Sequence, residues 1–186
     1  MSSLRVRPLT RERWPDFVDL FERRGPRGGH RNVPAYGCWC MYWRERTLEH
    51  GTPKKRAMGS LVRAGREPGL LAYDGSEPVG WISVSPRDDY AAILSSPQYR
   101  PEEDEEAVWS IVCFVVDKPR RREGVATALL EGALAHAQKR SAAVLEAYPH
   151  LEQAGDYMGH VDLFRAHGFR VVRKTKSRAI VRRKLS

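Results

Sequence analysis

The chain has 186 residues, of which 41% are apolar and 30% are charged, and its 32 basic and 23 acidic residues give a formal net charge of +9. A chain of this length and apolar content excludes wholesale disorder, and we expect one domain over residues 1–186 that folds without metals or disulfides. The positive charge favours an anionic ligand or partner without identifying it.

Two segments bear on the expected cellular location: the longest apolar run and the N-terminus. The longest nearly apolar run, Ala107–Val116, is about half as long as a membrane-spanning helix. The first residues, MSSLRVRPLT, lack the apolar core of a secretion signal. Three cysteines cannot pair evenly, which fits a reducing compartment. We therefore expect a cytoplasmic protein with no membrane partner.

The first predicted elements are a strand and an amphipathic helix. A short strand is expected over Leu4–Leu9. A helix beginning near Thr10 follows, because four apolar residues recur at the i, i+3, i+4, i+7 spacing of one helix face: Trp14, Phe17, Val18 and Phe21. Residues 25–37 hold four glycines and are expected to form a loop.

A second helix and a hairpin come next. Thr52 and Pro53 are typical of an N-cap and the first helical position. Strands over 70–73 and 79–84 flank Asp74-Gly75, a dipeptide typical of hairpin turns. The polar residues 85–106 are expected to form a surface insertion or a long loop over the functional site.

The C-terminal half predicts a central strand followed by alternating helices and strands. Ala107–Val116 is so apolar that it should be buried on both faces. The remaining elements are a helix over 124–139, a strand over 143–147, a helix from Asp156 to Gly168, and strands over 169–173 and 178–181. This order predicts a mixed α/β domain around one sheet.

The turn after the central strand is the most informative stretch. Gly124 opens the helix and allows close backbone approach, and basic residues precede it. Helix N-termini present unpaired N–H groups and a positive dipole end, so a pyrophosphate suits this turn. An ordinary solvated basic turn is the alternative. Neither G-x-G-x-x-G after a strand nor G-x-x-x-x-G-K-[ST] occurs in the chain.

Residues 121–126, RREGVA, resemble the R/Q-x-x-G-x-G/A signature of the GNAT superfamily of acyl-CoA N-acyltransferases, and LFRAHGF at 163–169 resembles its fourth helix. The resemblance covers nearly the whole chain. It implies a GNAT-like α/β (α+β) fold: a mixed, mostly antiparallel twisted sheet of six to seven strands, flanked by about four helices and splayed between the fourth and fifth strands. It also implies an acetyl-CoA-dependent N-acetyltransferase that moves the acetyl group directly to a primary amine, most simply that of a small molecule.

The resemblance assigns the acetyl-CoA site mainly to backbone atoms. In the family, main-chain groups at the end of the fourth strand pair with the pantetheine arm, and a strand N–H can polarise the thioester carbonyl. These positions here are Phe114, Val115 and Val116. The signature turn then holds the pyrophosphate, and its residues are Arg121, Arg122, Glu123, Gly124, Val125, Ala126 and Thr127.

Candidate catalytic residues also follow from the resemblance. Deprotonating a lysine-like amine at pH 7 costs roughly 4.6 kcal/mol, so a base is worthwhile. Glu146 occupies the place of a base that some family members carry, and burial would raise its pKa. Phe164 replaces the usual tyrosine acid, which leaves the general acid open between Tyr148 and Tyr157. Each of these residues has a purely structural alternative.

GCWCMYWR, residues 37–44, is the candidate acceptor wall. Trp39, Tyr42 and Trp43 are expected to form an aromatic wall or a cage for a cation, or alternatively an apolar plug over the sheet. Cys38-x-Cys40 lacks a second Cys or His pair, so no metal site is expected. Cys113 is expected to be an inert core residue.

Three further interpretations stay open. The acceptor could instead be a protein terminus, a lysine or an aminoacyl-tRNA. The chain could also be a non-catalytic module that binds acyl-CoA or nucleic acid, since nine Lys and Arg lie between Arg165 and Lys184 and no acidic residue follows Asp162. Nucleic acid is the less favoured partner. A homodimer stays open, because many members of the family dimerise.

Overall fold

The computed structural model describes residues 4–23, 37–100, 107–152 and 157–185. Within these ranges the strands are β1 (Arg5–Pro8), β2 (Gly69–Asp74), β3 (Glu77–Pro86), β4 (Val108–Val116), β5 (Val144–Ala147), β6 (Arg170–Lys174) and β7 (Ala179–Lys184). The α-helices are α1 (Trp14–Glu22), α2 (Thr52–Arg63), α3 (Ala91–Leu94), α4 (Val125–Lys139) and α5 (Val161–Ala166). None of the helices in these ranges is apolar over a length that would cross a membrane.

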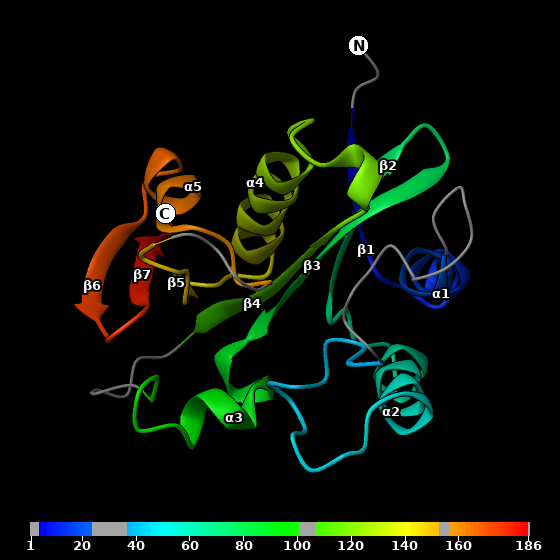
Figure 1. Cartoon of the computed structure of the whole chain (residues 1–186), viewed down its shortest axis with the longest axis horizontal. Helices are drawn as coiled ribbons and strands as arrows, with labels where there is room; N and C mark the ends of the chain where they lie inside the picture. Colours follow the sequence, from blue (N-terminus) through cyan, green and yellow to red (C-terminus); the bar gives the residue numbers. More distant parts are fainter. Residues whose placement is uncertain (1–3, 24–36, 101–106, 153–156, 186) are drawn as a thin grey trace.

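The strands form one seven-stranded sheet in the order β1-β2-β3-β4-β5-β7-β6 (Figure 1). Every neighbouring pair is antiparallel except β4 and β5, which are parallel. The predicted mixed, mostly antiparallel sheet is therefore confirmed. The described ranges contain five α-helices, one more than expected, because α3 forms within residues 85–106.

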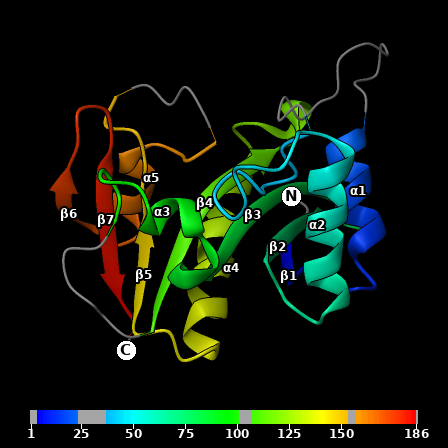
Figure 2. The same ribbon diagram turned by 90° about the horizontal axis from the view of Figure 1, so that it is seen from below.

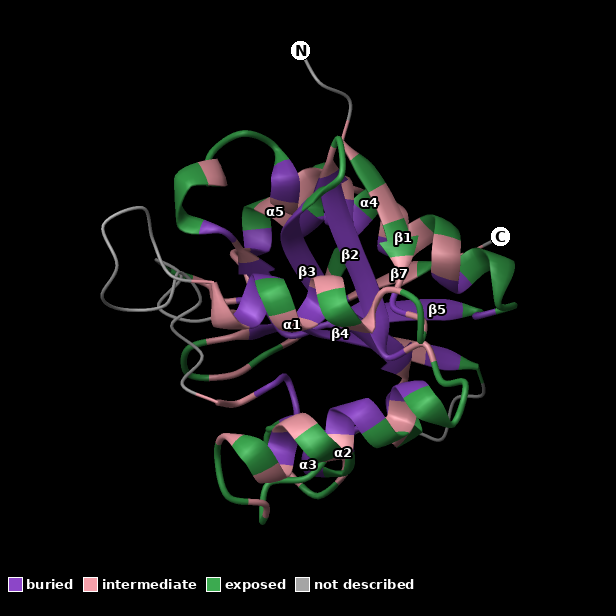
Figure 3. Cartoon of the chain, turned by 90° about the vertical axis from the view of Figure 1, so that its right-hand side faces the viewer, coloured by how far each residue is buried: buried purple, intermediate pink, exposed green. Residues whose placement is uncertain are grey.

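Helices cover both faces of the sheet. One apolar cluster joins the sheet to α1 and α2 through Phe17, Leu20 and Met58. The other joins it to α4 and α5 through Leu129 and Phe164. Figure 1 shows α4 and α5 on one side of the strands and α2 and α3 on the other. The central strands between these layers are almost wholly buried (Figure 3), as their apolar sequences predict.

β4 separates from β5 halfway along its length. The two strands pair only from Val108 to Ile111 on β4, whereas β4 continues to Val116 (Figure 2). At the same point β4 has one extra residue, because Ser83 pairs with Cys113 and Val84 with Ile111. This β-bulge at Val112 bends the strand away from its neighbour. The predicted splay between the fourth and fifth strands is thereby confirmed.

Several predicted boundaries differ from the structure. α1 begins at Trp14 rather than near Thr10. Thr52 is already helical, and Gly51 occupies the N-cap position of α2. The hairpin at Asp74-Gly75 is confirmed. Most of the predicted loop over 25–37 lies outside the described residues.

Two buried side chains hold residues 87–100 on the domain. Tyr90 and Ile93 are fully buried against the cluster that contains α1 and α2. The Tyr90 ring also lies under the Arg44 guanidinium at 4.4 Å. The segment is polar on average, yet these two apolar anchors hold it on the domain. Residues 101–106 lie outside the described residues.

The last helix begins later than predicted. α5 starts at Val161, with the His160 side chain accepting a hydrogen bond from the Asp162 N–H. Tyr157 therefore lies in the turn before this helix rather than on it, and Asp156 is outside the described residues. Because the connection is not helical, Tyr157 is free to follow the edge of β4.

Gly80 on β3 allows α4 to lie close to the sheet. An added Cβ would lie 2.6 Å from Cγ1 of Val125, the first residue of α4, and 3.1 Å from Cδ1 of Leu129. We expect Gly80→Ala to lower the stability by about 1–3 kcal/mol through overpacking, measured by thermal unfolding.

Gly59→Ala within α2 is the control. Its added Cβ would lie 3.1 Å from Arg63 Nη1 and 3.2 Å from Trp14 Cζ2, a looser fit than at Gly80, and its gain in helix propensity should offset this contact. An equal effect of both variants would contradict the close approach of α4.

Candidate active site

The predicted phosphate-binding turn connects β4 to α4. Gly124 occupies the N-cap with φ +81°, in the left-handed region that favours glycine, and no side chain caps the helix. The N–H of Ala128 bonds to the Gly124 carbonyl at 3.0 Å, so the amides of residues 125–127 have no acceptor within the helix. A Cβ added at Gly124 would meet no atom within 4 Å. These amides therefore lie at the positive end of a 15-residue helix, next to a glycine with open space on its Cβ side.

The basic side chains of this turn divide into two groups. Arg120 is committed to Asp74 at 2.5 Å and to Glu123 at 2.7 Å. Arg121 and Arg122 are exposed next to Gly124. The Glu123 carboxylate is thus neutralised by Arg120, and Arg121 and Arg122 give the turn its positive potential. An anion is the ligand that this arrangement favours.

The end of β4 presents main-chain groups toward the splay. The Asp117 N–H bonds to the Val79 carbonyl of β3 at 3.0 Å, and the Phe114 N–H bonds to the Tyr157 carbonyl at 2.5 Å. Because main-chain groups alternate along a strand, those of Phe114 and Val116 face the splay and those of Val115 face β3. Of the three predicted pantetheine-binding residues, Phe114 and Val116 are therefore placed to pair with a ligand on this side.

A cavity of about 540 Å³ opens beside the splay on the α1 and α2 side of the sheet. Its wall comes from the 37–50 loop, the segment after α3, the β4 bulge and the turn before α5. The lining residues are Cys38, Cys40, Tyr42, Trp43, Arg46, His50, Ser96, Gln98, Tyr99, Val112, Cys113, Tyr157, Met158 and Arg178. This mostly apolar and aromatic wall suits a small organic molecule.

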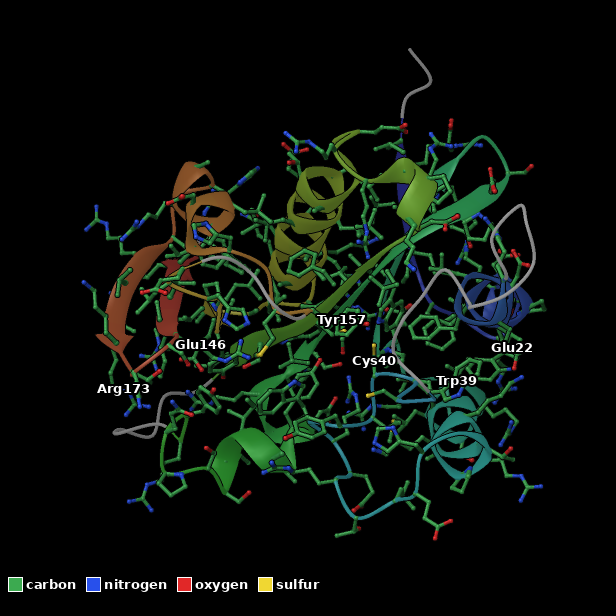
Figure 4. All side chains as sticks on the ribbon, in the orientation of Figure 1. Glu22, Trp39, Cys40, Glu146, Tyr157 and Arg173 are labelled. Carbon is green, nitrogen blue, oxygen red and sulfur yellow. The ribbon has the colours of Figure 1, made fainter. Side chains whose placement is uncertain are left out.

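The three predicted acceptor-binding aromatics do not act together. Tyr42 and Trp43 line the cavity, with their rings edge to face at 5.0 Å. Trp39 is 3% exposed and stacks on Phe21 in the core (Figure 4). The proposed wall is therefore made by two of the aromatics, whereas Trp39 forms the apolar plug.

The aromatic faces already hold cations of the protein itself. The Arg46 guanidinium lies 4.8 Å from the Tyr42 ring centroid and donates to the Tyr42 hydroxyl at 2.6 Å. The Lys55 ammonium lies 4.9 Å from the Trp39 ring and pairs with Glu22. These contacts argue against a cage for a cationic substrate at either ring.

Tyr157 is the only one of the three predicted catalytic side chains among the described residues that line the cavity. Burial, followed by the neighbouring Cys113 thiol, raises the pKa of Tyr157 to about 12. The hydroxyl is therefore protonated at neutral pH and able to donate a proton or a hydrogen bond. The Tyr157 carbonyl accepts a hydrogen bond from the Phe114 N–H. Tyr157 therefore lies next to the end of β4, on the side of the splay.

Glu146 and Tyr148 form a buried network instead. Glu146 is 2% exposed and accepts hydrogen bonds from the Tyr148 hydroxyl and, at 2.5 Å, from Arg182 Nε. Arg87 Nη1 lies 3.9 Å from the same carboxylate. Tyr148 is fully buried and also contacts Ser110 at 3.0 Å; burial and the Glu146 charge raise its pKa well above the usual value. This placement favours a structural role for both residues.

Several residues of the cavity wall were not predicted from the sequence. Tyr99 and Gln98 come from the segment expected to form a surface insertion or a long loop over the site, in which no single residue was predicted. Met158 comes from a turn that was predicted to be helical. Arg178 was predicted only as the first residue of the last strand, within a basic segment. No periodicity or motif marks these residues. The one available signal was the position of Met158 next to Tyr157, which the family resemblance had already selected.

The comparisons with known proteins agree with this architecture. Residues 33–169 match the acetyltransferase (GNAT) family. A ribosomal-protein-alanine N-acetyltransferase structure from Brucella melitensis is similar at 19% identity and a TM-score of 0.59, over 97% of this chain and 99% of that one. An N-acetyltransferase from Staphylococcus aureus Mu50 is similar at 12% identity and a TM-score of 0.58, over 100% of both chains.

A third similar structure contains a ligand. It is the PaiA N-acetyltransferase from Thermoplasma acidophilum in complex with coenzyme A, at 13% identity and a TM-score of 0.55, over 98% of this chain and 99% of that one. No curated protein matches the sequence. The family match spans well over half of the chain, and the sheet order, the splay and the turn before α4 are those that the signature implies. The chain therefore belongs to the acetyltransferase (GNAT) family.

Proposed function

We propose that the protein is an acetyl-CoA-dependent N-acetyltransferase that moves the acetyl group directly to a primary amine of a small molecule. The observation that carries this proposal is the uncapped N-terminus of α4, open above Gly124, next to the end of β4 where it leaves β5. The amides of residues 125–127, with Arg121 and Arg122, would hold the diphosphate of the co-substrate.

The pantetheine arm would lie along the splay edge of β4. Its amides would pair with the main chain of Val116, and the thioester carbonyl would replace the Tyr157 carbonyl at the Phe114 N–H. That N–H would then stabilise the negative charge that develops on the carbonyl oxygen during attack. The bound structures of similar proteins support the same class of ligand.

The acceptor amine would enter through the cavity. A volume of about 540 Å³ suits a small molecule, and Tyr42, Trp43 and Tyr99 offer an apolar surface to its body.

Glu146 does not line the cavity, so we assign it no proton abstraction. Its role is to position the side chains that it contacts near the end of β5, namely Arg182 and Tyr148. Tyr157 would protonate the departing CoA thiolate.

Binding nucleic acid through the basic C-terminal segment is less well supported. Four of its arginines are engaged within the domain: Arg173 with the carbonyls of Gln98 and Arg100, Arg178 with that of Tyr148, Arg182 with Glu146, and Arg183 with the carbonyl of His167. A protein N-terminus stays the second candidate acceptor, favoured by the similar ribosomal-protein-alanine N-acetyltransferase.

Two measurements, made one after the other, test the proposal. Isothermal titration with acetyl-CoA should show binding at one site, and a CoA-release assay against small amines and peptides should show turnover with a small amine. No binding of acetyl-CoA would reject the transferase. Binding with turnover of peptides alone would replace the small amine by a protein acceptor.

Tyr157→Phe should lower kcat about 10²-fold, because it removes the proposed proton donor. The affinity for acetyl-CoA should stay the same. Since the pKa of Tyr157 is about 12, the wild-type rate should not fall between pH 8 and pH 10. Tyr73→Phe is a matched control, because the Tyr73 hydroxyl bonds to Asp16 and lies outside the cavity. An unchanged kcat in Tyr157→Phe would remove this residue from catalysis.

A further inference from the structure

All three cysteines of the chain line the proposed acceptor cavity, and none of the three is in a disulfide. Cys40 Sγ and Cys113 Sγ lie 3.3 Å apart, although 73 positions separate them in the sequence. Cys40 is 4% exposed and Cys113 8% exposed. Because both line the cavity, a small reagent that enters it reaches a pair of thiols already in contact.

Two local backbone features bring this pair together. Trp39 and Cys40 have φ values of +49° and +53°, a conformation that L-residues rarely adopt and that buries both side chains. On the opposite side, the bulge at Val112 turns Val112 and Cys113 toward the same cluster as Cys40. Neither feature is needed for a core cysteine that only fills space.

Geometry singles out Cys40 among the cavity thiols. The Trp81 indole N–H donates to Cys40 Sγ at 3.1 Å, which holds this sulfur in a fixed position. Burial raises the pKa of the Cys38 thiol, which makes Cys38 a weak competitor for the same reagent. Cys113 lies directly behind Cys40 and is placed to resolve an oxidised form of it (Cys40 is labelled in Figure 4).

We propose that Cys40 and Cys113 are a modification site, at which a peroxide oxidises the two thiols to an intramolecular disulfide. The Cys40 thiol loses its proton and its sulfur attacks one oxygen of hydrogen peroxide; the O–O bond breaks, the displaced hydroxide takes up that proton, and a sulfenic acid and one water form. The Cys113 sulfur attacks the sulfenic sulfur, its proton leaves with the displaced hydroxide as a second water, and the S–S bond closes. The two thiols lose two electrons and the peroxide gains them.

The disulfide would change the acceptor cavity. Bonding shortens the sulfur–sulfur distance from 3.3 Å to about 2.05 Å and ties the 37–44 loop to the β4 bulge. Val112 and Cys113 adjoin Phe114, whose N–H is proposed to hold the thioester. A displacement there disturbs the alignment of amine and thioester, so acetyl transfer should slow at least about tenfold. This consequence rests on the proposed function, whereas formation of the disulfide does not.

Peptide mapping tests the disulfide without any assay of activity. The purified protein is treated with hydrogen peroxide, blocked with iodoacetamide and digested with trypsin. Trypsin leaves Cys38 and Cys40 together on peptide 32–44, so single variants identify the partner of Cys113. We expect a linked peptide pair, lighter by two hydrogens, in the wild type and in Cys38→Ser. Cys40→Ser should give no link.

Other outcomes overturn the proposal. Three reduced thiols after peroxide treatment, oxidation to sulfinic acid without a link, or an equal yield of link in Cys40→Ser would each reject the pair. The main test is disulfide formation in the wild-type protein, so it does not depend on whether a variant folds. Circular dichroism checks the folding of each variant.

The rate of CoA release gives a separate result. Oxidised wild type should be at least about tenfold slower than the reduced protein, and dithiothreitol should restore it. A link that leaves the rate unchanged would overturn the effect on the cavity but keep the modification site. Failure to bind acetyl-CoA in the reduced state would reject the proposed function, and the peptide map would still decide the disulfide.

Discussion

Gly124→Asp should weaken acetyl-CoA binding about 10³-fold. A carboxylate at this position would lie near the diphosphate proposed to sit on the N-terminus of α4. Two unit charges 4 Å apart repel by about 4 kcal/mol at the effective dielectric of a protein surface, which corresponds to this loss. No atom lies within 4 Å of an added Cβ, so packing would not hold the side chain away from the ligand.

Gly124→Asn is the matched control. Asparagine and aspartate both tolerate the left-handed φ of +81° and are comparable N-caps, so the two variants differ mainly in charge. The asparagine variant should lose much less affinity in isothermal titration. The difference between the variants should also shrink at high salt. Equal dissociation constants for both would place the diphosphate elsewhere.

Glu146→Gln should destabilise the fold by about 3 kcal/mol, because it leaves the Arg182 and Arg87 guanidiniums without their shared carboxylate. For a domain of this size the loss corresponds to a fall in Tm of about 6–12 °C. Arg87 has a 6% exposed side chain, so water does not compensate for the missing charge. Thermal unfolding of both proteins measures the effect.

Glu77→Gln provides the comparison at an exposed ion pair. Glu77 contacts Arg23 at 2.6 Å with a 53% exposed side chain, so the same chemical change should cost less than about 1 kcal/mol. The pH dependence of kcat distinguishes a structural role of Glu146 from a catalytic one. A Glu146→Gln variant that keeps its stability but loses activity mainly below about pH 8 would restore Glu146 as the base and contradict the positioning role.

The sequence was most informative for features that are formed by a short continuous segment of the chain. Gly124 and its basic neighbours predicted an anion site because a helix N-terminus binds anions through its own backbone, independently of what packs around it. β4 was equally predictable, since a strand buried on both faces is apolar throughout. The hairpin at Asp74-Gly75 depends on local dihedral preferences alone.

Residues that meet from distant parts of the chain were not predictable in the same way. A glutamate on β5 was a reasonable base from its position, yet Arg182 from β7 and Arg87 from beyond β3 decide its charge environment. Trp39 and Trp43 are the same residue type in the same short segment, so the sequence does not distinguish them. Tertiary packing places Trp39 in the core and Trp43 in the cavity wall.

The amino-acid sequence by itself therefore determined the order of the strands and of the four longer helices, the central strand and the glycine turn before α4, because each depends on periodicity or backbone geometry within a few residues. Only the tertiary structure decided that Tyr157 lies along β4, that the aromatic wall is incomplete without Tyr99, and that Cys40 contacts Cys113. These contacts depend on a one-residue bulge and on the path of loops across the sheet, and neither leaves a periodic signal in the sequence.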